Sequence, residues 1–215
     1  MEILNPNVAA EVADKLLEIQ AIRLQPQKPF TWASGWKSPI YCDNRLSLSF
    51  PKVRSMIKEQ LVKSIQHYFP EVEAIAGVAT AGIPQGALLA NDLDIPFIYV
   101  RSKPKGHGME NMIEGKITPG QKVVVVEDLI STGGSSLKAV QDLKDAGFEV
   151  LGMVAIFSYG FDVADENFKN SKVKLICLST YEAMLPRAVE RKYISDDVLS
   201  SLTEWRKSPS TWNPA

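Results

Sequence analysis

The chain has 215 residues, a formal net charge of −1 at pH 7 and 45% hydrophobic residues. This length suits one α/β domain with an added element and a sizeable core. The near balance of acids and bases argues against a nucleic-acid surface, and the sequence contains neither a polybasic run nor an apolar stretch long enough for a membrane. Because Cys42 and Cys177 lie far apart and Met1–Pro6 does not resemble a signal peptide, we expect reduced thiols and a cytoplasmic protein.

The first 71 residues predict two amphipathic helices separated by an irregular stretch. The helices are expected over residues 8–24 and, after Pro51, over residues 53–68. Residues 30–41 contain two tryptophans, a glycine and a proline, which predicts a packed loop leading into a short extended run. We expect residues 1–71 to form a small subdomain over the carboxyl ends of the strands that follow.

From residue 72 onward, predicted strands alternate with predicted helices. The strands are expected at residues 74–79, 96–100, 122–126, 150–157 and 173–178. The helices are expected at residues 84–91, 136–146, 162–169, 181–190 and 196–207. This alternation predicts an α/β fold with a mostly parallel central sheet and helices on both faces. Residues 72–215 would be its core with C-terminal helices, integrated with residues 1–71 into a single domain.

The strongest functional signal lies between Val123 and Ser135. Four consecutive valines predict a strand buried on both faces, and Glu127 and Asp128, the acid pair, stand where it would end. A loop of small residues and hydroxyls, residues 131–135, then precedes a helix, whose first N–H groups favour anions. The pattern predicts a ligand with a phosphate at one end and hydroxyls or a divalent cation beside it. The alternative is a buried strand and tight turn without a ligand.

Two further segments follow or precede predicted strands of the sheet. Arg101–Gly108 begins at a strand end and combines three cations with His107 between two glycines, which suits a mobile loop over an anionic leaving group. A solvated surface loop is the plain alternative. The third segment, residues 34–45, holds Tyr41, Cys42 and Arg45 ahead of the core, and Arg45 could pair with a carboxylate or remain a structural surface residue.

These segments together resemble a known family. Residues 123–135 resemble the 5-phosphoribosyl pyrophosphate (PRPP) signature of the type I phosphoribosyltransferases, and Thr80–Pro84 is similar to their pyrophosphate-binding turn. The pattern Arg-x-x-x-Lys-x-His-Gly, from Arg101 to Gly108, resembles the loop of the orotate phosphoribosyltransferases. Residues 34–45, with Ser-Gly-x-x-Ser-Pro, resemble the hood of that family, and we call them the hood. The recognisable motifs cover about residues 30–158.

The resemblance implies a type I phosphoribosyltransferase fold and a specific reaction. The ribose 5-phosphate of PRPP would pass to orotate, giving orotidine 5′-monophosphate and pyrophosphate in pyrimidine (UMP) biosynthesis. Mg²⁺ would be the cofactor, held mainly by PRPP and water rather than directly by the protein. The family resemblance also implies a homodimer in which the Arg101–Gly108 loop reaches into the neighbouring subunit's site.

Residue roles follow from the same resemblance, position by position. The catalytic candidates are Lys105, His107 and Asp128. The candidates for binding PRPP are Thr80, Gly82, Arg101, Lys105, His107, Glu127, Asp128, Leu129, Ile130, Ser131, Thr132, Gly133, Gly134 and Ser135. The candidates for binding orotate are Tyr41, Cys42, Arg45 and Ser131.

The sequence departs from the family at several ligand contacts. Ser102, Ala33 and Ala81 stand where many members have lysine, and the arginine that some members carry near residues 159–161 is missing. Lys103 is a candidate substitute for the lysine missing at position 102. Two alternatives remain: a purine phosphoribosyltransferase, which the hood and the Arg–Lys–His loop disfavour, and a non-catalytic PRPP-binding regulator, which the balanced charge does not support.

Overall fold

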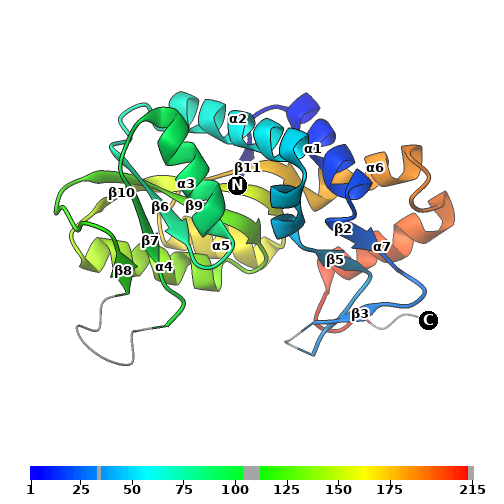
Figure 1. Ribbon diagram of the computed structural model, residues 1–215. Coiled ribbons are helices and arrows are strands. Elements are labelled where there is room, and N and C mark those ends of the chain that lie inside the picture. Colours follow the sequence, from blue (N-terminus) through cyan, green and yellow to red (C-terminus); the bar gives the residue numbers. More distant parts are fainter. Residues whose placement is uncertain (33–34, 104–111, 213–215) are drawn as a thin grey trace.

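A computed structural model describes residues 1–32, 35–103 and 112–212, and its centre is a seven-stranded sheet (Figure 1). The strands are β1 (Glu2–Ile3), β6 (Ala74–Val78), β7 (Phe97–Val100), β8 (Ile113–Glu114), β9 (Lys122–Ile130), β10 (Glu149–Ser158) and β11 (Leu175–Thr180). Their order is β1-β11-β10-β9-β6-β7-β8, and the neighbours run parallel except for β7 and β8. The predicted mostly parallel sheet is confirmed.

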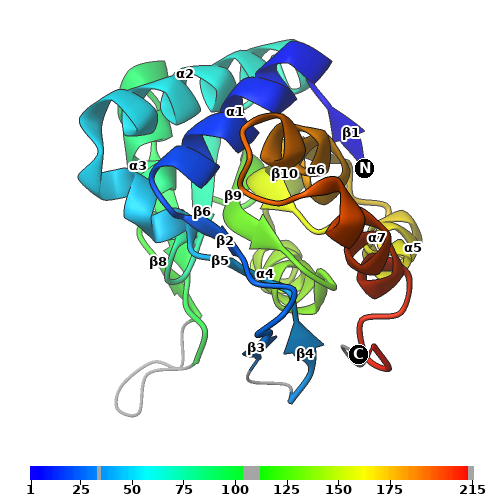
Figure 2. The same ribbon diagram turned by 90° about the vertical axis from the view of Figure 1, so that its right-hand side faces the viewer.

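Helices cover both faces of this sheet (Figures 1 and 2). One face packs against α1 (Pro6–Glu18), α2 (Pro51–Tyr68), α3 (Gly82–Leu93) and α6 (Tyr181–Glu190), and α7 (Leu199–Lys207) joins the same hydrophobic core through Leu202 and Trp205. The other face packs against α4 (Gly134–Asp145) and α5 (Asp162–Asn170). Val124 and Val126 point into the first layer and Val123 and Val125 into the second, which explains why this strand is apolar at every position.

The hood lies beside the sheet and is built from short strand pairs. It comprises β4 (Lys37–Ser38), β5 (Ile40–Cys42) and the start of the 3₁₀ helix η1 (Asn44–Ser49), with β2 (Ile22–Leu24) and β3 (Phe30–Thr31) as antiparallel partners. The C-terminal part of the chain supports it, because the fully buried Trp205 of α7 donates its indole N–H to the Lys37 carbonyl at 3.1 Å. The Trp32 ring packs edge-on against Trp205, in agreement with the packed loop predicted for residues 30–41.

Several boundaries differ from the sequence prediction by a few residues, and two of them differ most. The first helix ends at Glu18 rather than residue 24, because Gln20 adopts a left-handed backbone and Ile22–Leu24 pairs with β5 instead. The central strand runs to Ile130 rather than residue 126, because Glu127, Leu129 and Ile130 continue the pairing with β10. The acid pair therefore lies inside the strand and not beyond its end. The two-residue strands β1 and β8 were also missed, since each depends on a distant partner.

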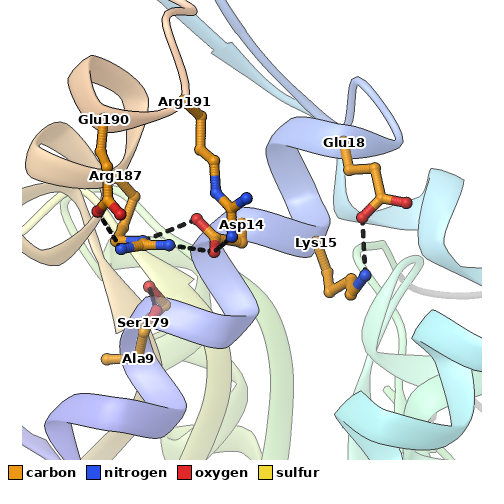
Figure 3. Close-up of polar contacts among 8 residues, drawn as sticks. All are labelled: Ala9, Asp14, Lys15, Glu18, Ser179, Arg187, Glu190 and Arg191. Atoms are coloured by element: carbon orange, nitrogen blue, oxygen red, sulfur yellow. Dashed lines mark hydrogen bonds and ion pairs between the residues drawn. The ribbon is translucent and has the colours of Figure 1, made fainter.

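The amino-terminal helix is fixed to the carboxyl-terminal third of the chain by polar contacts (Figure 3). Asp14 of α1 accepts two hydrogen bonds from Arg187 of α6, at 2.8 and 2.5 Å, and a third from Arg191 at 2.9 Å. Ser179 donates to the Ala9 carbonyl at 2.7 Å in the same interface. The Arg187 guanidinium lowers the pKa of Asp14 below its usual value.

Among the described residues, no helix is long and apolar enough to cross a membrane.

Asp14→Asn should reduce the free energy of unfolding near neutral pH, measured by urea denaturation. Because the folded-state pKa of Asp14 is depressed, its stabilisation exists above the unfolded-state pKa and disappears as pH falls through the folded value. The difference from wild type should therefore vanish in acid. Glu18→Gln, which removes only the exposed contact with Lys15 on the same helix, is the matched control and should change little. A loss that persists unchanged in acid would contradict this account.

Candidate active site

Three neighbouring parallel strands bring the predicted ligand-binding segments to one edge of the sheet. The acid pair lies near the carboxyl end of β9, the Thr80–Gly82 turn follows β6, and Arg101 follows β7. Because β6 pairs with both β7 and β9, the three segments are adjacent although they come from different parts of the sequence. Ligands of open α/β sheets bind at this edge.

The acid pair is the electrostatic centre of the site. Glu127 is only 7% exposed, and its carboxylate accepts hydrogen bonds from the Asp128 backbone N–H and the Ser136 hydroxyl, both at 3.0 Å. Burial, and then the nearby Asp128 charge, raise the pKa of Glu127 to about 8. Burial also raises the pKa of Asp128. Burial thus favours the protonated form of Glu127, and a protonated carboxyl group beside a carboxylate can both donate hydrogen bonds to ligand hydroxyls and accept hydrogen bonds from them.

The small-residue loop that follows is shaped to receive an anion. Gly133 has φ +79°, and a Cβ there would lie 2.7 Å from the Phe168 ring, so glycine is needed for both the backbone and the space. Asn167 donates to the Thr132 carbonyl at 2.9 Å and holds the loop against α5. No side chain in the described part of the chain caps α4, so its first N–H groups can bind an anion.

Other predicted positions in this segment contribute differently. Ile130 is fully buried in the core, so any contact it makes with a ligand comes from the backbone, whereas Leu129 is half-buried and packs against the core. Ser131 and Thr132 are half-buried, and Gly134 and Ser135 are exposed at the start of α4.

The Thr80–Gly82 turn is pressed against the central strand. A Cβ on Gly82 would lie 2.3 Å from the Val126 carbonyl oxygen, so only glycine allows this approach. Thr80 is exposed beside it, and the Ala79–Thr80 peptide is cis. The turn is thus held next to the acid pair, with the Thr80 side chain available to a ligand.

Arg101 lies where the chain leaves the sheet. Its guanidinium pairs with Glu114 of β8 at 3.0 Å and donates to the Lys103 carbonyl at 3.2 Å. Lys105 and His107 lie outside the described residues, so their predicted roles stay predictions.

The hood approaches the acid pair from the amino-terminal part of the chain. Asn44 donates its side-chain N–H to the Asp128 carbonyl at 2.7 Å, across 84 positions of sequence. Tyr41 is half-buried, and burial raises the pKa of the neighbouring Cys42 thiol well above its usual value, so Cys42 stays protonated. Arg45 is already held by Asp43 through two contacts, at 2.6 and 2.9 Å. To bind the carboxylate of a ligand, as predicted, the Arg45 guanidinium would have to contact Asp43 and the ligand together or break its contacts with Asp43.

Sequence reasoning overlooked three side chains that organise this site. Asn44, Ser136 and Asn167 all hydrogen-bond to the acid pair or the loop after it. Asn44 and Ser136 lie within or next to the motifs already singled out, and that proximity was the available signal. Asn167 lies in a helix with no motif, and only the folded chain brings it to Thr132.

Fold and site together define a phosphoribosyltransferase, and comparison with known proteins agrees. The phosphoribosyl transferase domain family matches residues 49–184. Orotate phosphoribosyltransferase of Cytophaga hutchinsonii is 60% identical over 206 residues, which cover 96% of this chain and 99% of that protein. The chain therefore belongs to the phosphoribosyl transferase family and, within it, to the orotate phosphoribosyltransferases.

Solved structures show the same similarity. The crystal structure of orotate phosphoribosyltransferase from Aeropyrum pernix has a TM-score of 0.74 at 29% identity, covering 86% of this chain and 99% of that one. The structure of Leishmania donovani UMP synthase has a TM-score of 0.78 at 26% identity. That alignment covers 92% of this chain but only 42% of the UMP synthase chain.

Gly133→Ala should destabilise the protein, because a left-handed backbone costs a side-chain-bearing residue about 1–2 kcal/mol and the added methyl group must displace Phe168. Gly134→Ala is the matched control. A Cβ at Gly134 would meet only the Thr132 hydroxyl at 3.9 Å, so this change should be neutral or stabilising. Denaturant titration of both variants measures the difference, and equal stabilities would contradict the assigned role of Gly133.

Proposed function

We propose that this chain transfers the ribose 5-phosphate of PRPP to orotate, producing orotidine 5′-monophosphate and pyrophosphate in pyrimidine biosynthesis. The observation that carries the proposal is the acid pair followed by the uncapped start of α4, with the hood tied directly to Asp128. The first two features form a ribose-phosphate site, and the hood supplies a second wall for a base. The 60% identity to a full-length orotate phosphoribosyltransferase supports orotate as that base.

The described residues suggest a division of roles around the sugar. The N–H groups of residues 131–135 would bind the 5-phosphate, and the acid pair would bind the ribose hydroxyls. A ring nitrogen of orotate would bond to the anomeric carbon while the bond between that carbon and the pyrophosphate oxygen breaks. Pyrophosphate would keep the electron pair of the broken bond, and the orotate nitrogen would lose its proton. Since charge develops mainly on the sugar and the leaving group, positioning and electrostatic stabilisation would supply most of the catalysis.

Base recognition would fall to the hood and to the start of the small-residue loop. We propose that the backbone of Tyr41 and Cys42 binds the edge of the orotate ring, and that Ser131 also contacts orotate. Arg45 could reach the orotate carboxylate by exchanging its contacts with Asp43.

Magnesium suits this donor set as a cofactor shared with the substrate. The described residues contain no group of three or more histidines, cysteines or acids able to hold a metal alone. Two adjacent carboxyl groups could instead orient the hydroxyls or waters of a cation bound mainly by PRPP. When bound, Mg²⁺ would neutralise charge on the pyrophosphate group. Thr80, Gly82 and Arg101 lie along the same edge and would contact that group from the protein side.

The remaining parts of the proposal concern assembly and location. We propose a cytoplasmic homodimer in which Lys105 and His107 contact PRPP in the neighbouring subunit, with Lys103 as a substitute for the lysine missing at position 102. The support is the loop pattern in the sequence and its start at the same edge of the sheet as the acid pair.

A substrate panel tests the reaction itself. Purified protein with PRPP and Mg²⁺ should consume orotate and release pyrophosphate, while uracil, adenine and hypoxanthine should remain unchanged. Base absorbance and pyrophosphate release are the two measurements. Turnover of adenine or hypoxanthine in place of orotate would favour a purine enzyme, and binding of PRPP without turnover of any base would favour a regulator.

A mixing experiment tests the shared loop. Lys105→Ala and Asp128→Ala should each be nearly inactive, since each lacks a group predicted to contact PRPP. In a random 1:1 mixture half of the dimers are mixed, and each has one intact site, so about a quarter of wild-type activity should return. No recovery, with mixed dimers verified by mass spectrometry, would show that the loop serves its own subunit.

A further inference from the structure

The hood is connected to the acid pair by a short chain of buried polar groups, and Asn44 is its central member. Asn44 is 1% exposed, donates its side-chain N–H to the Asp128 carbonyl at 2.7 Å and accepts a hydrogen bond from the Cys42 thiol at 3.3 Å. One amide therefore links the proposed base-binding edge with the proposed ribose-binding acid. Both ends of this amide are occupied, which fixes its orientation.

The series of buried polar groups continues from Asn44 toward the Thr80–Gly82 turn. Ser47 donates its hydroxyl to the Asn44 backbone carbonyl at 2.6 Å and accepts from the Gln85 side-chain N–H at 3.4 Å. Gln85 is 2% exposed and lies in the first turn of α3, directly after the Thr80–Gly82 turn. The series Gln85–Ser47–Asn44–Asp128 thus joins three segments that the proposed reaction uses for different parts of its substrates.

Packing alone would favour apolar side chains at the positions of this buried polar series. Burying amides and hydroxyls brings little net stability, and Gln85 Oε1 is a buried side-chain oxygen with no hydrogen-bond partner among the described residues. An apolar contact between η1 and α3 would avoid that cost. A network of directional bonds does provide what an apolar contact cannot, namely a defined register between the segments it joins.

We propose that Asn44 is a positioning residue, which holds the base-binding edge of the hood in register with Asp128 so that orotate and the anomeric carbon of PRPP meet. The inference rests on the proposed function. Asn44 itself would touch neither substrate. Its effect would be on the geometry of the bound pair, where a misplacement of about 1 Å can cost about 100-fold in rate.

Asn44→Leu tests this by removing both hydrogen bonds while keeping the side chain's size. We expect kcat with orotate to fall by about 30- to 100-fold. The dissociation constant for PRPP alone, measured by calorimetry, should change less than about threefold, because Asn44 takes no part in the hydrogen bonds of the Glu127 carboxylate or in the contact that holds the small-residue loop. A kcat close to wild type, or an equal loss of PRPP affinity, would overturn the proposal.

Two serines supply a milder variant with a matched control. Ser47 and Ser64 are both fully buried, and each donates to a backbone carbonyl, at 2.6 and 2.8 Å. Ser64 lies in α2 and its bond stays within that helix. Ser47→Ala should lower kcat about tenfold, whereas Ser64→Ala should leave it unchanged. If Asn44→Leu does not fold, the two serine variants still test the positioning role. Equal kcat values for Ser47→Ala and Ser64→Ala would overturn the proposal.

Hydrogen–deuterium exchange separates this inference from the proposed reaction. Peptides covering residues 37–50 should exchange faster in Ser47→Ala and Asn44→Leu than in wild type, while peptides of α4 should not change. Ser64→Ala should match wild type in both regions. This measurement needs no substrate, so a wild-type protein inactive toward orotate would sink the proposed function and leave the positioning role to be judged by exchange. Unchanged exchange in residues 37–50 would overturn the positioning role itself.

Discussion

The buried acid pair in the central strand is the constraint on which the rest of this structure depends. A strand flanked by β6 and β10 and covered on both faces is a costly place for two carboxyl groups. Two features reduce the cost. Glu127 accepts hydrogen bonds from Ser136 and from the Asp128 backbone, and burial raises the pKa of both carboxyl groups, which favours their uncharged forms.

Neighbouring elements are arranged around that pair. The loop after the acid pair turns at Gly133 and leaves the first N–H groups of α4 without a side-chain cap. The Thr80–Gly82 turn packs against β9, and Asn44 of the hood hydrogen-bonds to Asp128. Each element adds polar groups or free backbone N–H groups at one edge of the sheet. These contacts support the proposed site for a sugar phosphate, and the hood adds the wall on which base specificity would depend.

The agreement between prediction and structure follows the range of the interactions involved. The valine strand, the glycine-containing loop and the alternation of strands and helices were predictable because periodicity and turn chemistry act between near neighbours. The extension of β9 through Glu127–Ile130 was not, because it depends on pairing with β10. The first helix was predicted too long for the same reason, since residues 22–24 resemble a helix in isolation and become a strand only beside β5.

The sequence by itself determined the fold class and the order of the motifs, and it predicted a ribose-phosphate half of the site, since these depend on local patterns. Only the tertiary structure decided how the hood meets the acid pair and the loop after it. It placed Asn44 on Asp128, joined Asn167 to Thr132, and raised the pKa of Glu127 by burying it. These outcomes arise from burial and from hydrogen bonds between distant segments, and such interactions leave no periodic signal in the residues that make them.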